Sequence, residues 1–261
     1  MKGRPAAAIE VRGLRKQFGR QGVVAIEDAS LSIAPGEFVS VLGPSGCGKS
    51  TLLRCIAGIE TPSSGTVSVG GIPVSEPPEG LGMVFQRDAL LDWRTVADNL
   101  MLPIDFRRGD RAAARERAAA LLALTGLQGF EKAYPSQLSG GMRQRVAICR
   151  ALVDDPVLLL MDEPFGALDA LTRDQMNIEL QRMWRAEHKT VLFVTHSITE
   201  AIFLSDRVVV FTPRPGRIAD VIQVELPRPR RLALRTSERF NGYASHIRTL
   251  FEGMGLLKEE A

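Results

Sequence analysis

The chain has 261 residues, of which 33 are Lys or Arg and 30 are Asp or Glu, so its formal net charge at pH 7 is +3. This length suits one large α/β domain or a core with a subdomain, and so small a net charge gives no signal for nucleic acid. No apolar run approaches the ~18 residues that a membrane span needs, and the N-terminus has no apolar stretch typical of a signal peptide. The three cysteines form no C-x-x-C pair, which is typical of a reduced, cytosolic protein.

Two short strands are predicted near the start of the chain, at residues 9–11 and 23–26, around a turn at residues 19–22. Phe18 lies between them and is one of few aromatic residues in the chain. A loop that binds phosphates holds only the tail of a nucleotide, so an aromatic face for the base must come from elsewhere. Phe18 is a candidate for that face, and the alternative is that it fills the core.

The next segment contains a phosphate-binding loop. Residues 38–42 are apolar and partly β-branched, as in a buried strand, and residues 51–57, beginning with Thr51, read as a helix that Gly58 ends. The loop between them satisfies the pattern G-x-x-x-x-G-K-[ST]; its residues are Gly43, Pro44, Ser45, Gly46, Cys47, Gly48, Lys49 and Ser50. Glycines let backbone N–H groups surround phosphate oxygens, Lys49 reaches the β- and γ-phosphates, and the Ser50 hydroxyl holds Mg²⁺. The sequence therefore predicts binding of a nucleoside triphosphate.

Residues 62–71 alternate in polarity around glycine turns, which indicates a small antiparallel β layer. Residues 81–85 then form another predicted strand, which ends at Gln86. From residue 88 to 155 helical patterns dominate, at residues 95–101, 111–124 and 142–153. Directly before the last helix stand three small residues, Ser139, Gly140 and Gly141, which either form a second anion-binding device or are an ordinary helix cap.

Two further apolar runs, at residues 157–161 and 190–195, are typical of central parallel strands. The first ends in Asp162 and Glu163, and the second ends at His196. Buried carboxylates are costly unless they serve a site, and a Mg²⁺ ion and an attacking water would use one each. Since Gln86, Asp162, Glu163 and His196 all follow apolar strands, we expect them at one edge of one sheet, where ligands bind.

At this point the residues carry a family resemblance: the chain resembles the ATP-binding subunits of ABC transporters over residues 9–224. The motifs match in order and spacing, and they are the phosphate loop, Gln86, Leu138-Ser139-Gly140-Gly141, Asp162-Glu163 and His196. The resemblance implies an α/β fold with a P-loop NTPase (RecA-like) core, a small antiparallel β layer and an inserted α-helical subdomain. It implies a core over residues 1–87 and 156–226, and a helical subdomain over residues 88–155. A helical tail over residues 227–261 follows, whose basic residues we read as a solvated face, with a regulatory or anionic-lipid role as the alternative.

The resemblance also implies ATP and Mg²⁺ as cofactors. Phe18 is then expected to stack on adenine, and Ser50, Gln86 and Asp162 to serve the metal. The catalytic set is expected to be Glu163 as general base, His196 at the γ-phosphate, Gln86 as sensor of metal and water, and Lys49. Ser139, Gly140 and Gly141 are expected to close over the γ-phosphate held by a second copy of the chain in a head-to-tail dimer, with Asp169 in a loop that crosses the interface.

Two positions depart from the commonest family pattern, Met142 in place of glutamine and Gly166 in place of serine. Both, like Cys47 and residues 212–217, are similar to the importer branch for nitrate, sulfonate and taurine. The expected partners are permease subunits and a periplasmic or lipid-anchored solute-binding protein, with no nucleic acid, at the cytoplasmic face of the membrane. A surface cleft formed near Leu90, Leu91 and Trp93 is expected to receive a helix of the permease, with Trp93 as an aromatic anchor, unless Trp93 fills the core of the helical insertion. The ATPase subunit of an exporter remains the alternative. A DNA-repair ATPase of this type would carry a long coiled-coil insertion, and a ribosomal one would carry two nucleotide-binding cassettes, and this chain shows neither. A small-molecule kinase would not need residues 138–141.

Overall fold

The structure is a computed structural model that describes residues 4–19, 22–107, 109–166 and 168–256. These residues form two compact units. The phosphate-loop unit comprises the described residues of Ala7–Glu79 and Thr190–Ala261, and the helix-rich unit comprises those of Met1–Ala6 and Gly80–Lys189. The finer division into core, helical subdomain and tail stays a prediction.

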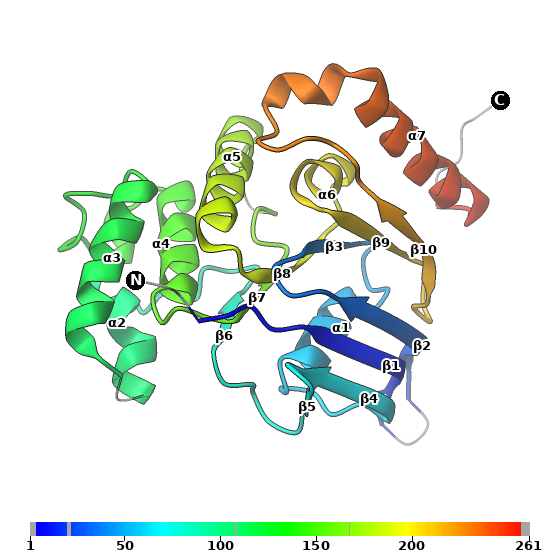
Figure 1. Cartoon of the computed structure of the whole chain (residues 1–261), viewed down its shortest axis with the longest axis horizontal. Coiled ribbons are helices and arrows are strands. Elements are labelled where there is room, and N and C mark those ends of the chain that lie inside the picture. Colours follow the sequence, from blue (N-terminus) through cyan, green and yellow to red (C-terminus); the bar gives the residue numbers. More distant parts are fainter. Residues whose placement is uncertain (1–3, 20–21, 108, 167, 257–261) are drawn as a thin grey trace. The chain divides into compact units, whose positions relative to one another are not determined.

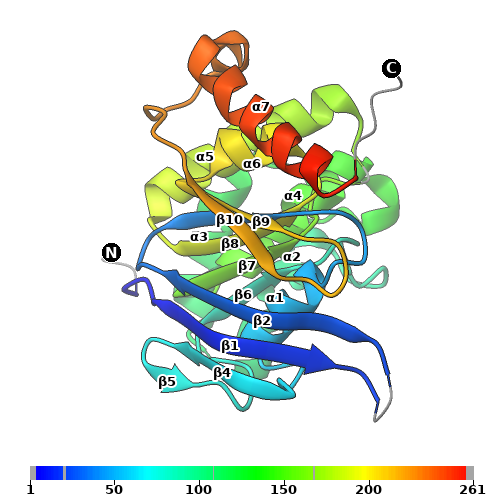
Figure 2. The same cartoon turned by 90° about the vertical axis from the view of Figure 1, so that its right-hand side faces the viewer.

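The phosphate-loop unit contains an antiparallel sheet in the order β2-β1-β4-β5. Its strands are β1 (Ile9–Gln17), β2 (Val24–Ile33), β4 (Ser64–Val69) and β5 (Ile72–Pro73). Figure 2 shows β2, β1 and β4 as neighbouring strands of this layer. The layer was predicted, although β1 is longer than the predicted segment because it continues through a polar, irregular stretch beyond residue 11.

The same unit contains parallel strands that carry the phosphate loop. β3 (Phe38–Leu42) pairs in parallel with β8 (Thr190–Thr195) and β9 (Arg207–Phe211), and β10 (Ile218–Gln223) runs antiparallel to β9. Every residue of β3 and β8 is buried, as expected for strands covered on both faces. The helices of the unit, drawn in Figure 1, are α1 (Lys49–Ile56), α6 (Ile198–Leu204) and α7 (Glu238–Gly253), with a short 3₁₀ turn at Leu232–Thr236.

The C-terminal helix α7 packs on the rest of this unit through one stripe. Phe240, Ala244 and Ile247 are buried, at the spacing of one helix face, and α7 contacts α6. Ser237 caps its start by accepting a hydrogen bond from the Phe240 N–H. The remaining faces of α7 carry exposed polar residues, so the tail is an amphipathic helix on a folded support.

The helix-rich unit pairs β6 (Leu81–Val84) in parallel with β7 (Leu158–Asp162). Its helices are α2 (Val96–Arg107), α3 (Arg111–Leu124), α4 (Gly140–Leu152) and α5 (Ala170–Glu187), with a 3₁₀ turn at Pro135–Gln137. Helices α2, α3 and α4 pack on one another, as Figure 1 shows in green. The predicted helix at 95–101 is longer in the structure because α2 continues through Pro103. The predicted α/β class is confirmed, and within the described residues each helix is too short or too polar to cross a membrane.

Candidate nucleotide-binding site

The phosphate loop connects β3 to α1 in a conformation that needs glycine. Gly46 has φ of 76° and Gly48 has φ of 102°, in the left-handed region that disfavours other residues. A Cβ on Gly48 would lie 2.6 Å from the Ala25 carbonyl oxygen, so a side chain has no room there. The loop ends at the start of α1, where the helix dipole and free N–H groups favour an anion. The predicted phosphate cradle is therefore present as a backbone shape.

Lys49 supplies the charge of this cradle. Its side chain is buried, and its Nζ donates hydrogen bonds to the carbonyl oxygens of Gly43 at 2.8 Å and Pro44 at 2.9 Å. Both acceptors belong to the loop itself, so the ammonium group lies within the curve that the loop describes. Nζ also lies 3.9 Å from the Cys47 sulfur, which is buried in the same loop. A buried ammonium beside free N–H groups suits a phosphate chain.

The turn between β9 and β10 supports the phosphate loop from outside the motif. Arg214 Nε donates to the Gly46 carbonyl oxygen at 3.1 Å. A Cβ on Gly216 would lie 2.0 Å from the Cys47 carbonyl oxygen, so the two backbones touch. The Gly216 N–H also donates to the Ala25 carbonyl oxygen at 3.0 Å. From the sequence, residues 212–217 were noted only because they are similar to one branch of a family. Their contacts with the phosphate loop were not predicted.

His196 follows β8 and is exposed, in a turn that hydrogen bonds hold firmly. Thr195 Oγ1 donates to Glu200 Oε2 at 2.6 Å and accepts from the Ser197 N–H at 3.0 Å. Ser197 in turn caps α6 by accepting from the Glu200 N–H at 3.3 Å. Glu200 is 5% exposed and was not singled out from the sequence, although Ser-x-x-Glu before a helix was a readable capping signal.

Phe18 directly follows β1 and is 41% exposed, so the alternative that it fills the core is wrong. Lys16 Nζ lies 4.9 Å from the centroid of its ring, a cation–π distance. The Phe18 N–H donates to the Val23 carbonyl oxygen at 3.1 Å, which fixes the backbone at this position. An accessible aromatic ring on a fixed backbone suits stacking against a base.

In the helix-rich unit, the structure brings together the carboxylates after β7 and the amide after β6. Asp162 is the last residue of β7 and Glu163 follows it. Gln86 Nε2 donates to Glu163 Oε2 at 3.4 Å. Glu163 has φ of 45°, a left-handed conformation that is uncommon for a residue with a side chain. The predicted neighbourhood of Gln86 and Glu163 is confirmed.

The segment after Gln86 is held by arginines of α4. Arg143 Nε donates to Asp88 Oδ2 at 3.0 Å, and Arg150 donates to the carbonyl oxygens of Asp88 at 2.9 Å and Ala89 at 2.8 Å. Trp93 is 74% exposed, so the alternative that it fills a core is wrong. The segment is thus anchored at one end and presents a large aromatic side chain at the other.

The start of α4 has the geometry of a capped helix with little room at its first turn. Ser139 Oγ accepts from the Met142 N–H at 3.2 Å, while Ser139 and Gly140 are exposed. A Cβ on Gly141 would lie 2.6 Å from the Thr172 Cγ2 atom, so glycine is required. Nearby, Asp169 caps α5 by accepting from the Thr172 N–H at 3.0 Å, and its hydrogen bonds with Thr172 lower the pKa of its carboxyl.

The donor groups present suit a nucleotide with Mg²⁺ better than a metal held by protein alone. Among the described residues, no three His, Cys, Asp or Glu side chains form a metal-binding group. The hydroxyl of Ser50, the amide of Gln86 and the carboxylate of Asp162 are oxygen donors of the kind Mg²⁺ takes alongside substrate phosphates. The first belongs to the phosphate-loop unit, and the other two belong to the helix-rich unit.

Comparisons with known proteins agree with these features. A family model described as "ABC transporter" matches residues 26–166. An uncharacterized ABC transporter ATP-binding protein of Methanocaldococcus jannaschii is 46% identical over 97% of this chain and 92% of its own length. The aliphatic sulfonates import ATP-binding protein SsuB of Bacillus cereus is 40% identical over 96% of this chain and 98% of its own. The taurine import ATP-binding protein TauB of Yersinia pestis is 48% identical over 81% of this chain and 82% of its own.

A solved structure is also similar. It is an ATP-binding cassette in a dimeric, post-hydrolysis state bound to ADP and Pi, 32% identical to this chain. It matches with a TM-score of 0.73 and covers 84% of this chain and 100% of the solved one.

Proposed function

The chain belongs to the ABC transporter family and is an ATPase of that family, and we propose that it hydrolyses ATP to drive uptake of a small solute through a separate membrane permease. The solute we propose is an anion or zwitterion of the nitrate, sulfonate or taurine kind. The observation that carries the ATPase part is the contact between Gln86 Nε2 and Glu163 Oε2 in a chain that also has the phosphate loop. The names of the sulfonate and taurine relatives support the solute class.

The nucleotide is proposed to bind through the phosphate-loop unit. Loop N–H groups and the Lys49 ammonium hold the β- and γ-phosphates, because the buried charge of Lys49 already lies among the loop carbonyls. Phe18 offers its exposed ring to adenine, and His196 is proposed to contact the γ-phosphate from its hydrogen-bonded turn. Thr51 and the rest of the loop complete the phosphate contacts through the start of α1.

Hydrolysis is proposed to depend on the residues that end β6 and β7. Glu163 accepts a proton from water while the water oxygen attacks the γ-phosphorus and the bond to the β–γ bridging oxygen breaks, giving ADP and phosphate. Gln86, within hydrogen-bonding distance of Glu163, orients that water. Bound Mg²⁺ would neutralise developing charge on the phosphates, with Ser50, Gln86 and Asp162 as its protein contacts.

A second copy of the chain is proposed to complete each site. The exposed start of α4, with Ser139, Gly140 and Gly141, is a second anion-binding device that the chain's own phosphate loop does not need. Two copies arranged head to tail would use both devices on each γ-phosphate. The dimeric state of the similar solved cassette supports this arrangement.

The permease is proposed to contact the helix-rich unit, at the cytoplasmic face of the membrane. Trp93 is exposed at the end of the segment that Arg143 and Arg150 hold. A cavity of about 310 Å³ lies beside α2 and α3, and its lining includes Ala97, Met101 and Leu122. Charged side chains, Asp98, Arg111, Arg115 and Glu131, also line this cavity. An exposed aromatic anchor and a hollow with apolar and charged walls suit an amphipathic helix of a partner. A periplasmic or lipid-anchored binding protein would deliver the solute.

Reconstituted transport tests this function. The chain would be placed in proteoliposomes with the permease encoded nearest to its gene, and uptake of labelled taurine, an alkanesulfonate and nitrate would be measured with ATP on the side of the chain. We expect ATP-dependent movement of at least one of these solutes toward that side, and its loss with Glu163→Gln. ATP-driven movement away from that side would instead identify an exporter.

A further inference from the structure

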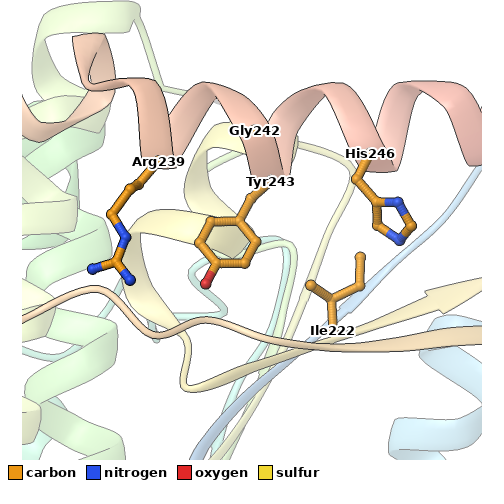
Figure 3. A pocket seen from close by; sticks show the side chains of 5 residues that line it. All are labelled: Ile222, Arg239, Gly242, Tyr243 and His246. Carbon is orange, nitrogen blue, oxygen red and sulfur yellow. The ribbon is translucent and has the colours of Figure 1, made fainter.

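The C-terminal helix and the last strand line an open surface cavity that the ATPase function does not use. It has a volume of about 370 Å³ and lies between α7 and β10, wholly within the phosphate-loop unit. Its lining residues are Ile222, Arg239, Gly242, Tyr243 and His246. Figure 3 shows Arg239, Tyr243 and His246 pointing from successive turns of α7 toward the strand side. Ligand pockets in proteins usually have volumes of about 300–1,000 Å³, so this cavity is large enough for a small molecule.

Two hydrogen bonds fix the walls of this cavity. His246 Nε2 lies 2.8 Å from Asp220 Oδ2 in β10, and the Tyr243 hydroxyl accepts from the Glu225 N–H at 3.0 Å. Gly242, which also lines the cavity, adds no side chain to it, and a Cβ there would meet no atom within 4 Å. The cavity is therefore preorganised by contacts between helix and strand.

The chemistry of the lining favours an anion with an apolar body. Among the described residues, no carboxylate lies within ion-pair distance of Arg239, whereas the nearby Asp220 is already paired with His246. Ile222 is only 8% exposed and, with the Tyr243 ring, gives the cavity an apolar wall. An unpaired guanidinium beside apolar surface matches a carboxylate or sulfonate that carries a short hydrocarbon chain.

We propose that this cavity is a second ligand site, which binds a small organic anion with its charged group on Arg239 and its apolar body against Ile222 and Tyr243. The proposal goes beyond the proposed function and does not depend on it, because no residue of the cavity belongs to the nucleotide site. β10 follows directly after the turn that carries Arg214 and Gly216, and this turn holds the phosphate loop. The ligand would therefore contact a strand that is joined to this turn.

Binding to the purified full-length chain tests the proposal without any ATPase measurement. The probes are pentanesulfonate and hexanoate. The controls are inorganic sulfate, an anion without a hydrocarbon chain, and pentanol, which has a hydrocarbon chain but no charge. Ligand-observed NMR titrations should show saturable binding of the two organic anions with a dissociation constant of about 0.1–5 mM, a range typical of small ligands. Sulfate and pentanol should bind at least about tenfold more weakly, because each lacks one of the two contacts.

Three variants, one of them a control, locate the binding site. Arg239→Met should weaken pentanesulfonate binding at least about fivefold, because it removes the charge-assisted contact. Arg248→Met, on the same helix but outside the cavity, should leave binding unchanged. Gly242→Leu should fill the space and abolish binding while the helix is retained, since leucine favours helix over glycine. Thermal melting would verify that each variant is folded.

The source of the anion is settled by a further titration. Vesicles of phosphatidylglycerol would be titrated with the wild-type chain and with Arg239→Met. We expect vesicle binding, if it occurs, to be equal for both chains. Pentanesulfonate binding that is unchanged in Arg239→Met or Gly242→Leu would overturn the proposal. Binding that depends on Arg239 with vesicles but not with free anions would also overturn it and assign the site to a lipid headgroup.

Discussion

Two loops of this protein follow parallel strands, β3 and β6, yet they differ in what they present to their surroundings. The loop after β3 buries its own functional side chains, including Lys49 and Cys47. The segment after β6 begins with the exposed Gln86 and reaches Trp93, a large side chain that is mostly in solvent. The first loop curves around the Lys49 ammonium group, and the second presents an aromatic side chain at the surface.

The two loops are also held by different forces. The phosphate loop is held by a close backbone contact of Gly216 with Cys47 and by one charged side chain, since Arg214 donates to the Gly46 carbonyl oxygen. Charged side chains fix the segment after Gln86, because Arg143 and Arg150 reach it from α4. A backbone fit suits a small ligand that must be held in one geometry, whereas a side-chain anchor suits a segment that responds to a large partner. Variants should therefore affect nucleotide binding in one region and assembly or turnover in the other.

The largest effect is expected from two variants that separate ATP binding from ATP hydrolysis. Glu163→Gln keeps the shape of the side chain and removes the general base, so phosphate release should fall by about 10²–10⁴-fold while ATP affinity stays near the wild-type value. Lys49→Met should instead lose ATP binding, because it removes the charge buried in the phosphate loop. Both are measured by phosphate release and by titration with a fluorescent ATP analogue. Wild-type turnover in Glu163→Gln would remove this residue from its role.

The next effect concerns Trp93. Trp93→Ala should weaken assembly with the permease by about 30-fold, the effect of losing one central aromatic anchor. ATP binding by the isolated chain should not change. Ile72→Ala is a matched control, because Ile72 is an equally exposed apolar residue of the other unit. Co-purification in detergent with quantified permease provides the measurement, and equal loss of assembly and ATP binding would mean that Trp93 is structural.

A smaller effect is expected at the support of the phosphate loop. Arg214→Ala removes the hydrogen bond to the Gly46 carbonyl oxygen, and we expect ATP affinity to fall about three- to tenfold, as for the net loss of one ordinary, solvent-exposed hydrogen bond. Arg217→Ala is the control, since Arg217 in the same turn pairs with Glu27 at 2.6 Å and does not contact the loop. Equal effects of the two variants would show that the turn acts only through general stability.

The smallest effect compares two buried thiols, Cys47 in the phosphate loop and Cys149 in α4. Burial raises the pKa of Cys149 to about 12, so its alkylation rate should still rise with pH up to about pH 11 and should not respond to nucleotide. Cys47 lies beside the Lys49 ammonium, and MgATP should slow its alkylation severalfold. Mass spectrometry of peptides after timed alkylation measures both sites. Alkylation of Cys47 that leaves nucleotide affinity unchanged would contradict its place in the cradle.

The sequence predicted the elements whose signals are local. The apolar runs of β3 and β8 have the predicted bounds, and α3 begins after Asp110, whose side chain caps it. Contacts between distant segments were not predictable in this way. The contact of Gly216 with Cys47 joins residues far apart in the chain, and a glycine in a turn gives no sign of the backbone that it will touch.

Side-chain exposure was also beyond the sequence, because an aromatic residue can be buried or exposed with the same neighbours. The sequence left open whether the side chains of Phe18 and Trp93 are buried in the core, and only the structure shows that both are exposed. The Gln86–Glu163 contact was predictable from position, because both residues follow strands of one sheet. The network of Thr195, Ser197 and Glu200 had a capping signal in the sequence, but its link to Thr195 depends on the geometry of the turn.

We propose above that two copies of the chain join around ATP, each using its phosphate loop and the exposed start of α4 of the other. The most direct test is size-exclusion chromatography with light scattering on Glu163→Gln, with and without saturating MgATP. We expect a monomer without nucleotide and a dimer with MgATP, because slow turnover leaves the nucleotide in the interface. A variant that binds MgATP but remains a monomer at saturation would contradict the proposed dimer.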